Sequence, residues 1–409
     1  MPDQRLIDDL TVGSVEVLPA GALAAKLASA EREGRPLRVK LGVDPTAPDI
    51  HLGHTVVLNK LRQFQDAGHV AVLIIGDYTA RIGDPSGRSK TRPRLDPAVI
   101  DANARTYQEQ ALLILDDDPA KLEMPHNGEW LGTLTTEDIF ELAATTTVAR
   151  ILERDDFAKR WAAHQPISML EMLYPLAQGY DSVAVRADIE LGGTDQKFNL
   201  FMGRDLQQYF GQEPQVVMTL DILPGTDGAE RMSKSTGNYI GVTEDPRDVY
   251  GKIMSIPDET IMTYFRLLTA HHADEIATLE RELAGGTVNP RDLKARLARE
   301  ILTRLRGDAA ASAAEDHFDR VFRRHEAADD LQELRLEAGD ADDGRVFLPR
   351  VMERWFGATR SEWRRRIAQG GVSLDGEPVS ELALPVEALV GRRLKAGKSA
   401  AAQGLVKGV

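Results

Sequence analysis

Two histidines and a glycine lie close together in the segment PTAPDIHLGH, residues 45–54. His51 and His54 are separated by Leu52 and Gly53, after a predicted strand and at the start of a predicted helix. Helix N-termini at such turns bind phosphates in α/β sheets. The imidazoles could donate hydrogen bonds to phosphate oxygens, and the glycine would let the backbone approach a ligand. A capped helix start with two incidental histidines explains the same pattern, so the motif alone leaves both interpretations open.

A second segment, ERMSKSTGN at residues 230–238, follows the last predicted strand of the sheet. Lys234 lies between Ser233 and Ser235 with Gly237 behind them, which indicates a mobile cationic loop. A lysine in such a loop can stabilise the charge that develops on a leaving pyrophosphate. A flexible, solvated surface turn explains the segment as well when it is taken alone.

Three polar side chains fall on one face of a predicted helix in YPLAQGYD, residues 174–181. Tyr174, Gln178 and Asp181 occupy positions i, i+4 and i+7, which lie above one another on a helix. A polar helix surface would give this pattern too, but apolar residues line the flank of this face, so it is not simply solvated. LGGTDQKFN, residues 191–199, predicts another strand-to-helix turn, where two glycines permit close backbone approach.

The elements that must position these residues alternate between strands and helices. Residues 37–44 predict a strand, residues 55–67 a helix and residues 70–77 a strand buried on both faces. This βαβ unit is expected in a parallel sheet with a right-handed crossover. Further elements are expected as a loop at 80–95, helices at 97–116, 136–153, 167–179 and 195–210, and a strand at 216–223. The sequence thus predicts an α/β fold, in which a Rossmann-like doubly wound parallel sheet with a helical insertion occupies residues 1–240.

The chain changes in character after this domain. Residues 241–325 have helical periodicity and predict an α-helical domain, residues 326–345 predict a linker, and residues 346–409 predict a small basic α+β domain. From Arg345 onward the chain has 12 basic and 6 acidic residues, whereas the rest has 38 basic and 58 acidic residues. An acidic body with a basic C-terminal domain indicates a localised anionic partner.

The composition is that of a globular protein, with 409 residues, 42 % hydrophobic and 28 % charged. No apolar run approaches the roughly 18 to 20 residues that a membrane span needs. The absence of cysteine excludes disulfides, thiolate metal sites and a cysteine nucleophile. The opening MPDQRLIDDL carries acids and lacks an apolar core, so we expect no secretory signal. These features predict a cytoplasmic protein without a membrane partner.

Together and in this order, the two motifs resemble the HIGH and KMSKS signatures of class I aminoacyl-tRNA synthetases. The first signature is written His51-Leu52-Gly53-His54 and the second Arg231-Met232-Ser233-Lys234-Ser235. Arginine keeps the charge at the first position of the second signature, but it is not an equivalent point charge. The resemblance implies that five residues carry the catalytic work: Thr46, His51, His54, Arg231 and Lys234.

The polar helix face and the glycine turn resemble the tyrosine pocket of tyrosyl-tRNA synthetases, and the likeness covers the chain from about residue 30 to its end. The resemblance implies that Asp181 accepts a hydrogen bond from the substrate phenol and that Gln196 positions the substrate carboxylate. It implies that Asp84, Tyr174 and Gln178 hold the α-ammonium. The residues implied to contact ATP are Gly42, Asp44, Gly53, Gly193, Asp195, Met232, Ser233 and Lys234.

Lys40 departs from many members of this family, which have a tyrosine at this position that shares the phenol contact. Two roles are open for Lys40: a hydrogen bond to the phenol oxygen, or an ion pair with Asp181. The run KLGVDPTAPDIHLGH, residues 40–54, resembles that of a second bacterial subgroup of the family.

The segment ATRSEWRRRIAQGGVSLDGEPV in the C-terminal domain predicts a basic helix, a Gly370-Gly371 turn and a short strand. A solvated helix face is the usual meaning of such a charge run. The pattern also resembles a small RNA-binding domain first known from ribosomal proteins, which is commonly appended to bacterial tyrosyl enzymes. That resemblance implies phosphate contacts to RNA from four arginines: Arg360, Arg364, Arg365 and Arg366.

The resemblance implies a two-step reaction, in which ATP activates tyrosine and the tyrosyl group then passes to tRNA(Tyr). It implies ATP as a substrate with Mg²⁺, no dedicated metal site and a homodimer. Two rivals are a tryptophanyl enzyme of the same superfold and a catalytically silent, RNA-binding paralogue. The polar set on residues 174–181 argues against the first rival, and the intact histidines and Lys234 argue against the second.

Overall fold

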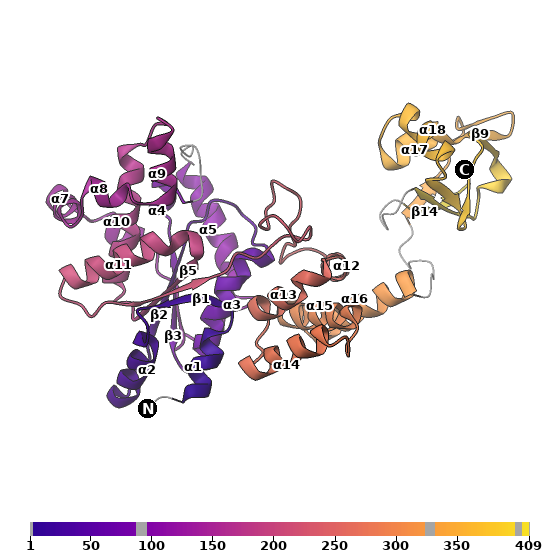
Figure 1. Cartoon of the computed structure of the whole chain (residues 1–409). Helices are drawn as coiled ribbons and strands as arrows, with labels where there is room; N and C mark the ends of the chain where they lie inside the picture. The colour runs from indigo at the N-terminus through magenta and orange to yellow at the C-terminus, as the bar shows by residue number, and fades with distance from the viewer. Residues whose placement is uncertain (1–2, 87–95, 324–331, 397–402, 409) are drawn as a thin grey trace. The chain divides into compact units, whose positions relative to one another are not determined.

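A computed structural model describes residues 3–86, 96–323, 332–396 and 403–408 of the chain. The chain falls into two compact units, Met1–Asp316 and His317–Val409. Each unit has its own sheet and helices (Figure 1). The units are therefore described one at a time.

The first unit is built on a six-stranded sheet with the strand order β1-β6-β5-β2-β3-β4. All neighbouring pairs are parallel except β1 with β6. The strands are β1 Ser14–Leu18, β2 Arg38–Val43, β3 Val70–Ile75, β4 Leu122–Glu123, β5 Ile189–Gly193 and β6 Val216–Leu220. The central strands are apolar because both of their faces are covered, and the whole of β6 is buried. This confirms the predicted doubly wound α/β fold.

Helices α3, α10 and α11 cover the sheet where the site residues lie. Helix α3 packs on β2, β3 and β5, and α11 packs on β5 and β6. Helices α10 and α11 lie together on one side of the sheet and α3 on the other (Figure 1). The helices of this part are α1 Gln4–Thr11, α2 Ala22–Glu33, α3 Leu52–Asp66, α4 Thr79–Ile82, α5 Pro97–Ala111, α6 Gly128–Leu131, α7 Thr136–Ala144, α8 Val148–Ile151, α9 Asp155–Ala162, α10 Met169–Ala184 and α11 Lys197–Tyr209.

Three local predictions differ from the structure. The helix expected over 136–153 is two helices, α7 and α8, because the chain turns between them and Thr147 caps α8 by accepting the Arg150 N–H at 3.1 Å. The helix expected over 97–116 ends at Ala111. The loop expected over 80–95 begins with the last turn of α4, and its residues 87–95 lie outside the described residues. Strand β1, at the antiparallel edge, was not expected.

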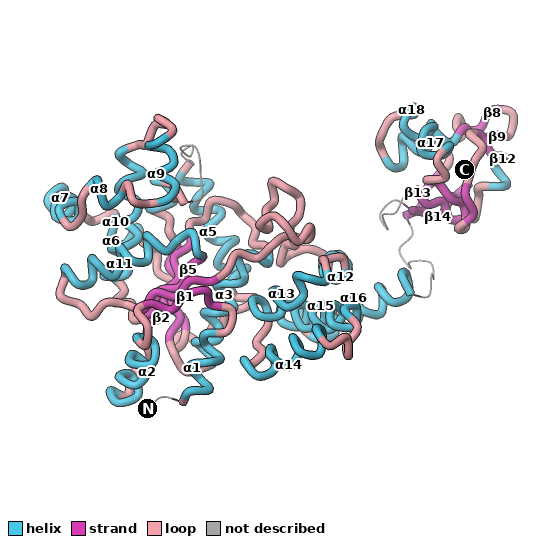
Figure 2. The backbone as a smooth tube through the Cα atoms, in the orientation of Figure 1, coloured by secondary structure: helices cyan, strands magenta, loops and turns pink. Residues whose placement is uncertain are grey.

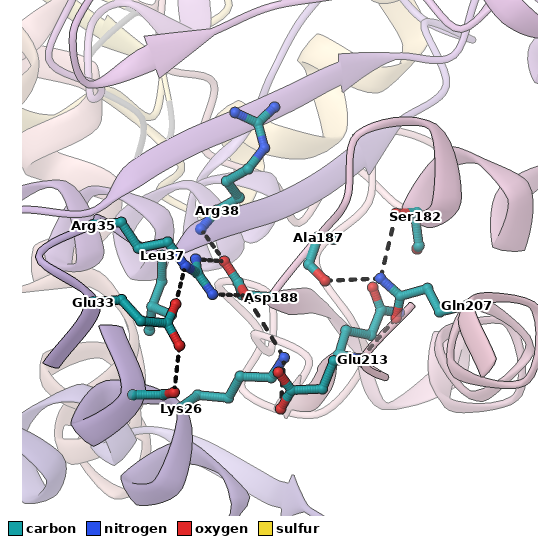
Figure 3. A network of polar contacts seen from close by, with 12 residues as sticks. Lys26, Glu33, Arg35, Leu37, Arg38, Ser182, Ala187, Asp188, Gln207 and Glu213 are labelled. Carbon is teal, nitrogen blue, oxygen red and sulfur yellow. Dashed lines mark hydrogen bonds and ion pairs between the residues drawn. The ribbon is translucent and has the colours of Figure 1, made fainter. Parts of the chain in front are cut away.

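Asp188, just before β5, ties α2 and β2 to the start of β5 (Figure 3). Its buried carboxylate accepts hydrogen bonds from the Arg35 guanidinium at 2.8 Å and from the Arg38 N–H at 2.9 Å. The Lys26 ammonium lies 3.6 Å away, and it also pairs with Glu213. A buried carboxylate is costly unless it is paired, so this network fixes the amino ends of the two strands that carry the site.

The helices predicted after residue 245 are present in the described part of the chain. They are α12 Pro246–Met254, α13 Ile261–Leu268, α14 Ala273–Ala284, α15 Pro290–Arg306 and α16 Asp308–Phe318. Helix α13 packs on α3, and Asp9 of α1 accepts the Ala273 N–H at 3.0 Å. This helical part is thereby joined to the sheet within one unit. Among the described residues, no helix is both long and apolar enough to cross a lipid bilayer.

In the described residues of the second unit, two small antiparallel-rich sheets lie with the α-helices α17 and α18 (Figure 2). Its elements are β7 Gln332–Arg335, β8 Ala341–Asp342, β9 Arg345–Phe347, α17 Leu348–Phe356, α18 Arg360–Ala368, β10 Val372–Leu374, β11 Glu377–Pro378, β12 Ala383–Pro385, β13 Arg393–Ala396 and β14 Gln403–Lys407. Trp363 of α18 is buried in the core of this unit. The predicted basic helix, glycine turn and strand are α18, Gly370 with φ +70°, and β10.

The segment expected as a linker, residues 326–345, is folded where the structure describes it. Its residues 332–342 contain β7 and β8, and β7 pairs with β14 in parallel. Leu334 is fully buried in the core of the second unit. The division of the chain at residues 240, 325 and 345 stays a prediction.

Candidate active site

A cavity of about 320 Å³ opens at the carboxyl ends of β2 and β5, between α3 and α10. In open α/β sheets, ligands bind in the crevice at this end of the strands. The cavity brings together segments that are far apart in the sequence. The predicted site residues that line it are Gly42, Asp44, Thr46, His54, Asp84, Tyr174, Gln178, Asp181, Gly193 and Gln196.

Asp181 places a buried carboxylate in the cavity wall. It is 3 % exposed and accepts hydrogen bonds from Trp130 Nε1 at 2.8 Å and from Asn127 Nδ2 at 3.3 Å. Burial raises the pKa of Asp181 to about 6, while the charge of Lys40 and these two donors oppose the rise. A carboxylate can accept about four hydrogen bonds, so Asp181 keeps capacity for a donor that enters the cavity.

Gln178 and Tyr174, on the same face of α10, offer further acceptors to the cavity. The Oε1 atom of Gln178 is buried and has no hydrogen-bond partner among the described residues. The Tyr174 hydroxyl donates to Asp44 Oδ2 at 2.9 Å, so its oxygen can still accept. Burial and the nearby Asp44 carboxylate raise the pKa of Tyr174 well above its usual value, which keeps this hydroxyl protonated. An unpaired buried acceptor is costly, so this wall is prepared for a ligand with N–H donors.

Asp84 and Gln196 meet on the opposite side of the cavity. Gln196 Nε2 donates to Asp84 Oδ2 at 2.8 Å. Both are supported by Arg154, which is buried and donates to Ser86 Oγ and to Asn199 Oδ1, each at 2.9 Å. Asn199 in turn donates to Gln196 Oε1 at 2.9 Å. Arg154 therefore holds the two predicted substrate residues in one network.

Lys40 lies beneath the cavity and is not part of its lining. Its ammonium pairs with Glu190 Oε1 at 2.8 Å, and both side chains are 0 % exposed. The expected ion pair with Asp181 is therefore wrong, because Lys40 and Glu190 are direct neighbours on parallel strands and the sheet register joins them. Direct contact between Lys40 and a substrate stays a prediction.

His51 and His54 form the amino end of α3, with ring centroids 3.9 Å apart. The Nδ1 atom of His51 accepts the Gly53 N–H at 3.1 Å, and the Nδ1 atom of His54 accepts the His51 N–H at 3.3 Å. With Nδ1 as acceptor, a neutral imidazole carries its proton on Nε2. Desolvation by the surrounding protein, together with the charges of His54 and Lys234, lowers the pKa of His51 to about 3. Desolvation and the charge of Lys234 lower the pKa of His54 to about 4. Both rings are thus neutral Nε2–H donors at the positive end of a helix.

Backbone hydrogen bonds hold Met232 and Ser233 of the second motif in place, whereas the Lys234 side chain is partly exposed. Met232 is buried and its N–H donates to the Leu223 carbonyl at 3.0 Å, while the Ser233 N–H donates to Asn238 Oδ1 at 2.9 Å. Lys234 Nζ lies 2.6 Å from Asp49 Oδ2 of the first motif. The two motifs therefore meet through an ion pair, although neither Lys234 nor Met232 lines the cavity.

Arg231 and Asp195 lie close enough for their charges to interact, and neither lines the cavity. Burial and the neighbouring Asp84 raise the pKa of Asp195, and the charge of Arg231 opposes this rise. Gly53 and Gly193 lie where a Cβ would be in close contact with neighbouring side chains, and their predicted contact with ATP stays a prediction. A Cβ at Gly53 would lie 2.9 Å from the His51 ring, and a Cβ at Gly193 would lie 2.7 Å from Asp195 Oδ1.

The predicted RNA-binding arginines of α18 differ in their surroundings. Arg360 pairs with Glu353 at 2.6 Å, and Arg366 pairs with Glu362 and lies over the Trp363 ring. Arg364 lies over the Phe347 ring at 5.3 Å. Arg365 is exposed and has no partner in the described part of the chain. No group of three or more metal-ligating residues forms a candidate metal site among the described residues.

Several residues of the site were missed by the sequence analysis. Trp130 and Asn127 hold Asp181, and Thr79 donates to Asp44 Oδ1 at 2.6 Å. They belong to short helical turns of the insertion, which carry no periodic or motif signal. Glu190 could have been found, because a charged residue in an otherwise apolar predicted strand calls for a buried partner.

The family comparison agrees with this site. The model of the family described as class I tRNA synthetases (W and Y) matches residues 32–323. The chain belongs to this family and is a class I aminoacyl-tRNA synthetase. This confirms the class inferred from the two motifs.

Individual relatives point to tyrosine. A tyrosine–tRNA ligase of Moorella thermoacetica is 54 % identical over 395 residues, which is 96 % of this chain and 94 % of the relative. A tyrosine–tRNA ligase of Thermotoga maritima is 51 % identical over 368 residues, 90 % of each chain. The resemblance to tyrosyl-tRNA synthetases is thereby confirmed, while the bacterial subgroup stays a prediction.

Solved structures of tyrosyl-tRNA synthetases share the fold. A C-terminally truncated mitochondrial enzyme of Aspergillus nidulans matches with a TM-score of 0.65 and 20 % identity, over 78 % of this chain and 94 % of that chain. An Archaeoglobus fulgidus enzyme complexed with L-tyrosine matches with a TM-score of 0.62 and 22 % identity, over 76 % of this chain and 98 % of that chain.

Proposed function

We propose that this chain activates L-tyrosine with ATP in the cavity at β2 and β5, and then transfers the tyrosyl group to the 3′ end of tRNA(Tyr). The observation that carries the proposal is the wall of α10, where a buried carboxylate and an unpaired amide oxygen face the cavity that Thr46 and His54 of the first motif also line. A ligand with a hydroxyl donor at one end and an ammonium at the other satisfies both. Tyrosine has these two groups.

Four acceptor groups of the cavity bind the hydroxyl and ammonium ends of tyrosine. Asp181 accepts the phenol hydroxyl at the buried end. The α-ammonium is held by Gln178 Oε1, the Tyr174 hydroxyl and Asp84, since each can accept a hydrogen bond. Gln196, whose amide is already aligned by Asp84, positions the carboxylate. This arrangement supplies acceptors to the ammonium and a donor to the carboxylate.

Selectivity follows from the burial of Asp181. Phenylalanine would cover Asp181 without offering a donor, and an unpaired buried acceptor is costly. Tyrosyl-tRNA synthetases are themselves a known example of rejection of phenylalanine in this way. Tryptophan is a larger substrate whose donor lies at another position, so the same carboxylate disfavours it.

ATP binds as its magnesium complex between the glycine-lined turns and the two motifs. Gly42, Gly53 and Gly193 let the nucleotide approach the backbone, and Asp44 and Asp195 accept its hydroxyl and amino donors. Met232 and Ser233 anchor the loop that covers the triphosphate. Mg²⁺ enters with the substrate, and this chain supplies the phosphate contacts.

The first step needs no nucleophilic side chain, because the tyrosine carboxylate is already ionised and attacks the α-phosphate. Catalysis is then positioning together with electrostatic stabilisation. Thr46 and the Nε2–H groups of His51 and His54 donate to the phosphates from the α3 side. Lys234 leaves Asp49 and, with Arg231, neutralises the departing pyrophosphate from the other side. A ribose hydroxyl of the tRNA 3′ end then attacks the carbonyl carbon of the tyrosyl adenylate, the bond from this carbon to the phosphate oxygen breaks, and AMP leaves.

The second unit binds the tRNA backbone through the basic face of α18. Arg364 and Arg365 are exposed and have no carboxylate partner among the residues that the structure describes, whereas Arg360 and Arg366 are partly neutralised by neighbouring glutamates. Contacts to phosphates fix orientation and are weakened by salt. These contacts should therefore affect charging of tRNA and leave tyrosine activation unchanged.

The chain acts as a homodimer in the cytoplasm. Support for the dimer comes from apolar residues of α7 and α10, of which Phe140 is 69 % exposed and Met169 is 72 % exposed. They adjoin an apolar hollow of about 400 Å³ that is lined by Ile139 and Leu170. Exposed apolar patches of this kind mark protein interfaces. Sedimentation equilibrium should give twice the chain mass, and Phe140→Asp should shift it to the single-chain mass.

ATP–pyrophosphate exchange measured with each of the amino acids separately tests the proposed function. Exchange above background with tyrosine, together with charging of tRNA(Tyr), is the expected result. Exchange with tryptophan in place of tyrosine would select the first rival. Binding of tRNA without any exchange would select the silent paralogue.

A further inference from the structure

A fully buried ion pair lies directly under the tyrosine pocket. Lys40 of β2 and Glu190 of β5 are opposite each other in the parallel ladder, with Nζ and Oε1 2.8 Å apart and both side chains 0 % exposed. Burying two charges costs free energy that an apolar pair of similar volume would not cost. Such a pair therefore calls for a role other than stability.

The ammonium of Lys40 reaches beyond its strand to α10. It donates to the Gln178 carbonyl at 2.9 Å and to Ser182 Oγ at 2.7 Å, in addition to Glu190. An ammonium has three donors, so all of them are used. Gln178 and Ser182 bracket Asp181 on one turn of the helix, and this turn carries the two acceptors of the pocket.

This turn of α10 needs an external support. Pro175 lies inside the helix one turn earlier and cannot donate the usual backbone hydrogen bond. The position of the following turn is therefore set by contacts with the sheet and with α11. Gln207 of α11 contributes by donating to the Ser182 carbonyl at 3.4 Å (Figure 3).

Glu190 completes the network from the sheet. One carboxylate oxygen accepts from Lys40 and from Gln178 Nε2 at 3.4 Å, and the other accepts from Ser182 Oγ at 3.1 Å and from Gln215 Nε2. Gly203 of α11 closes over this carboxylate, because a Cβ there would lie 2.8 Å from Ser182 Oγ. Gln178, an acceptor of the pocket, is thus held by the pair through both its carbonyl and its side chain.

We propose that Lys40 and Glu190 form one positioning unit beneath the tyrosine pocket, which fixes the Gln178–Ser182 turn of α10 and keeps Asp181 an acceptor for the substrate hydroxyl. The inference rests on the proposed tyrosine site. In place of the direct contact between Lys40 and the substrate that the sequence predicted, both members of the pair act through Gln178 and Asp181.

The charges of the pair also act on Asp181 in opposite senses. Burial raises the pKa of Asp181, Lys40 opposes that rise and Glu190 adds to it. From α6 the carboxylate meets only neutral donors, Trp130 and the capping Asn127. Other titratable groups that line the same cavity are Tyr174 on α10 and, from the neighbouring elements, Asp44, His54, Asp84 and Tyr107. The charges of the pair largely cancel at Asp181, so removal of one member changes the pKa of Asp181. Loss of Lys40 should raise this pKa, and loss of Glu190 should lower it.

The test is the pH profile of kcat/KM for tyrosine in ATP–pyrophosphate exchange, from about pH 5 to about pH 9. The acid limb of this profile is the range in which kcat/KM falls as the pH decreases. Lys40→Met leaves the Glu190 charge beside Asp181, so the acid limb should move to higher pH by at least about half a pH unit. Glu190→Gln leaves the Lys40 charge, so the acid limb should move to lower pH. Lys40→Met should also raise the KM for tyrosine about tenfold or more, with the KM for ATP within about threefold of wild type.

Two variants control for general damage. Ser182→Ala removes one acceptor of Lys40 without a change of charge, so it should raise the KM for tyrosine and leave the acid limb in place. Arg160→Met breaks another buried ion pair of α10, in which Arg160 Nη1 lies 2.8 Å from Glu171 Oε1. It should leave the acid limb at its wild-type pH.

The outcomes separate this inference from the proposed function. Wild-type enzyme without tyrosine-dependent exchange would refute the function itself. Active wild-type enzyme whose acid limb moves in the same direction in Lys40→Met and Glu190→Gln, or in neither, would overturn the positioning unit. If Lys40→Met does not fold, the downward shift in Glu190→Gln and the tyrosine-specific KM effect of Ser182→Ala decide the matter.

Discussion

Substitution of Asp181 by asparagine is a sharp perturbation of the pocket, because it replaces one oxygen atom and removes one charge. In the wild type, the carboxylate is 3 % exposed and already accepts from Trp130 and Asn127. A buried hydrogen bond to a charged group contributes about 1.5 to 3 kcal/mol. At about 1.4 kcal/mol for each factor of ten, Asp181→Asn should lower kcat/KM for tyrosine roughly 10- to 150-fold.

Although Asp181→Asn should lower the activity, it should not lower the free energy of unfolding at pH 8. The pKa of Asp181 is raised from 3.8 to about 6 by burial, so this group favours the folded state most below about pH 3.8. That contribution is lost as the pH rises through about 6, and the ionised form then costs the folded wild type about 3 kcal/mol at most. The substituted amide does not titrate. At pH 8 the variant should therefore be at least as stable as the wild type.

Two measurements check this prediction. ATP–pyrophosphate exchange at varied tyrosine and phenylalanine concentrations gives both specificity constants, and urea unfolding at about pH 8 and about pH 5 gives the stability. The preference for tyrosine over phenylalanine should fall along with kcat/KM for tyrosine. An unchanged preference in a variant with wild-type stability would refute the role of Asp181. A loss of activity together with a large loss of stability would refute the assigned environment of the carboxylate.

Three further predictions follow from the site and from the second unit. Lys234→Met should lower kcat for adenylate formation by about 10²-fold in single-turnover assays and leave the KM for tyrosine within about threefold, and an equal effect on both would contradict a role at pyrophosphate. His51 has a pKa of about 3 against an ordinary value of 6.5, so it favours folding above about pH 6.5 and loses this contribution as the pH falls toward 4. The urea midpoint of His51→Asn should therefore vary less than that of wild type between about pH 6.5 and about pH 4. Arg365→Ala should weaken tRNA binding and reduce the slope of log affinity against log salt by about 0.7 to 0.9, whereas the paired Arg366→Ala should reduce it less; equal slopes for both variants would contradict α18 as the contact surface.

The parts of the site that could be predicted from the sequence are those that lie within one short segment. The first motif combines a strand end, a capped helix start and a glycine, and all three signals are local. The α10 face is likewise local, since the spacing of Gln178 and Asp181 is that of one helix. The structure brings these segments to one cavity, as the crossover rule for parallel strands predicts.

The parts that could not be predicted depend on strand register and on the inserted helices. The partner of Lys40 is 150 residues away in the sequence, and only the alignment of β2 with β5 identifies it as Glu190. Trp130 reaches Asp181 from a four-residue helix that has no periodicity to detect. The edge strand β1 is only five residues long and only partly buried, so it lacks the continuous apolar run of the central strands. Leu334 and Leu336 are buried in the core of the second unit, but they lie in a segment that is otherwise polar and acidic.

A crystal structure of the enzyme with bound tyrosine would show directly which groups hold the substrate. We expect the phenol oxygen within hydrogen-bond distance of Asp181 and the α-ammonium against Gln178 Oε1 and Tyr174. Lys40 should stay on Glu190, with the pair still covered by α10. Tyrosine bound elsewhere, or with its phenol on Lys40 and its ammonium away from Gln178, would contradict the account.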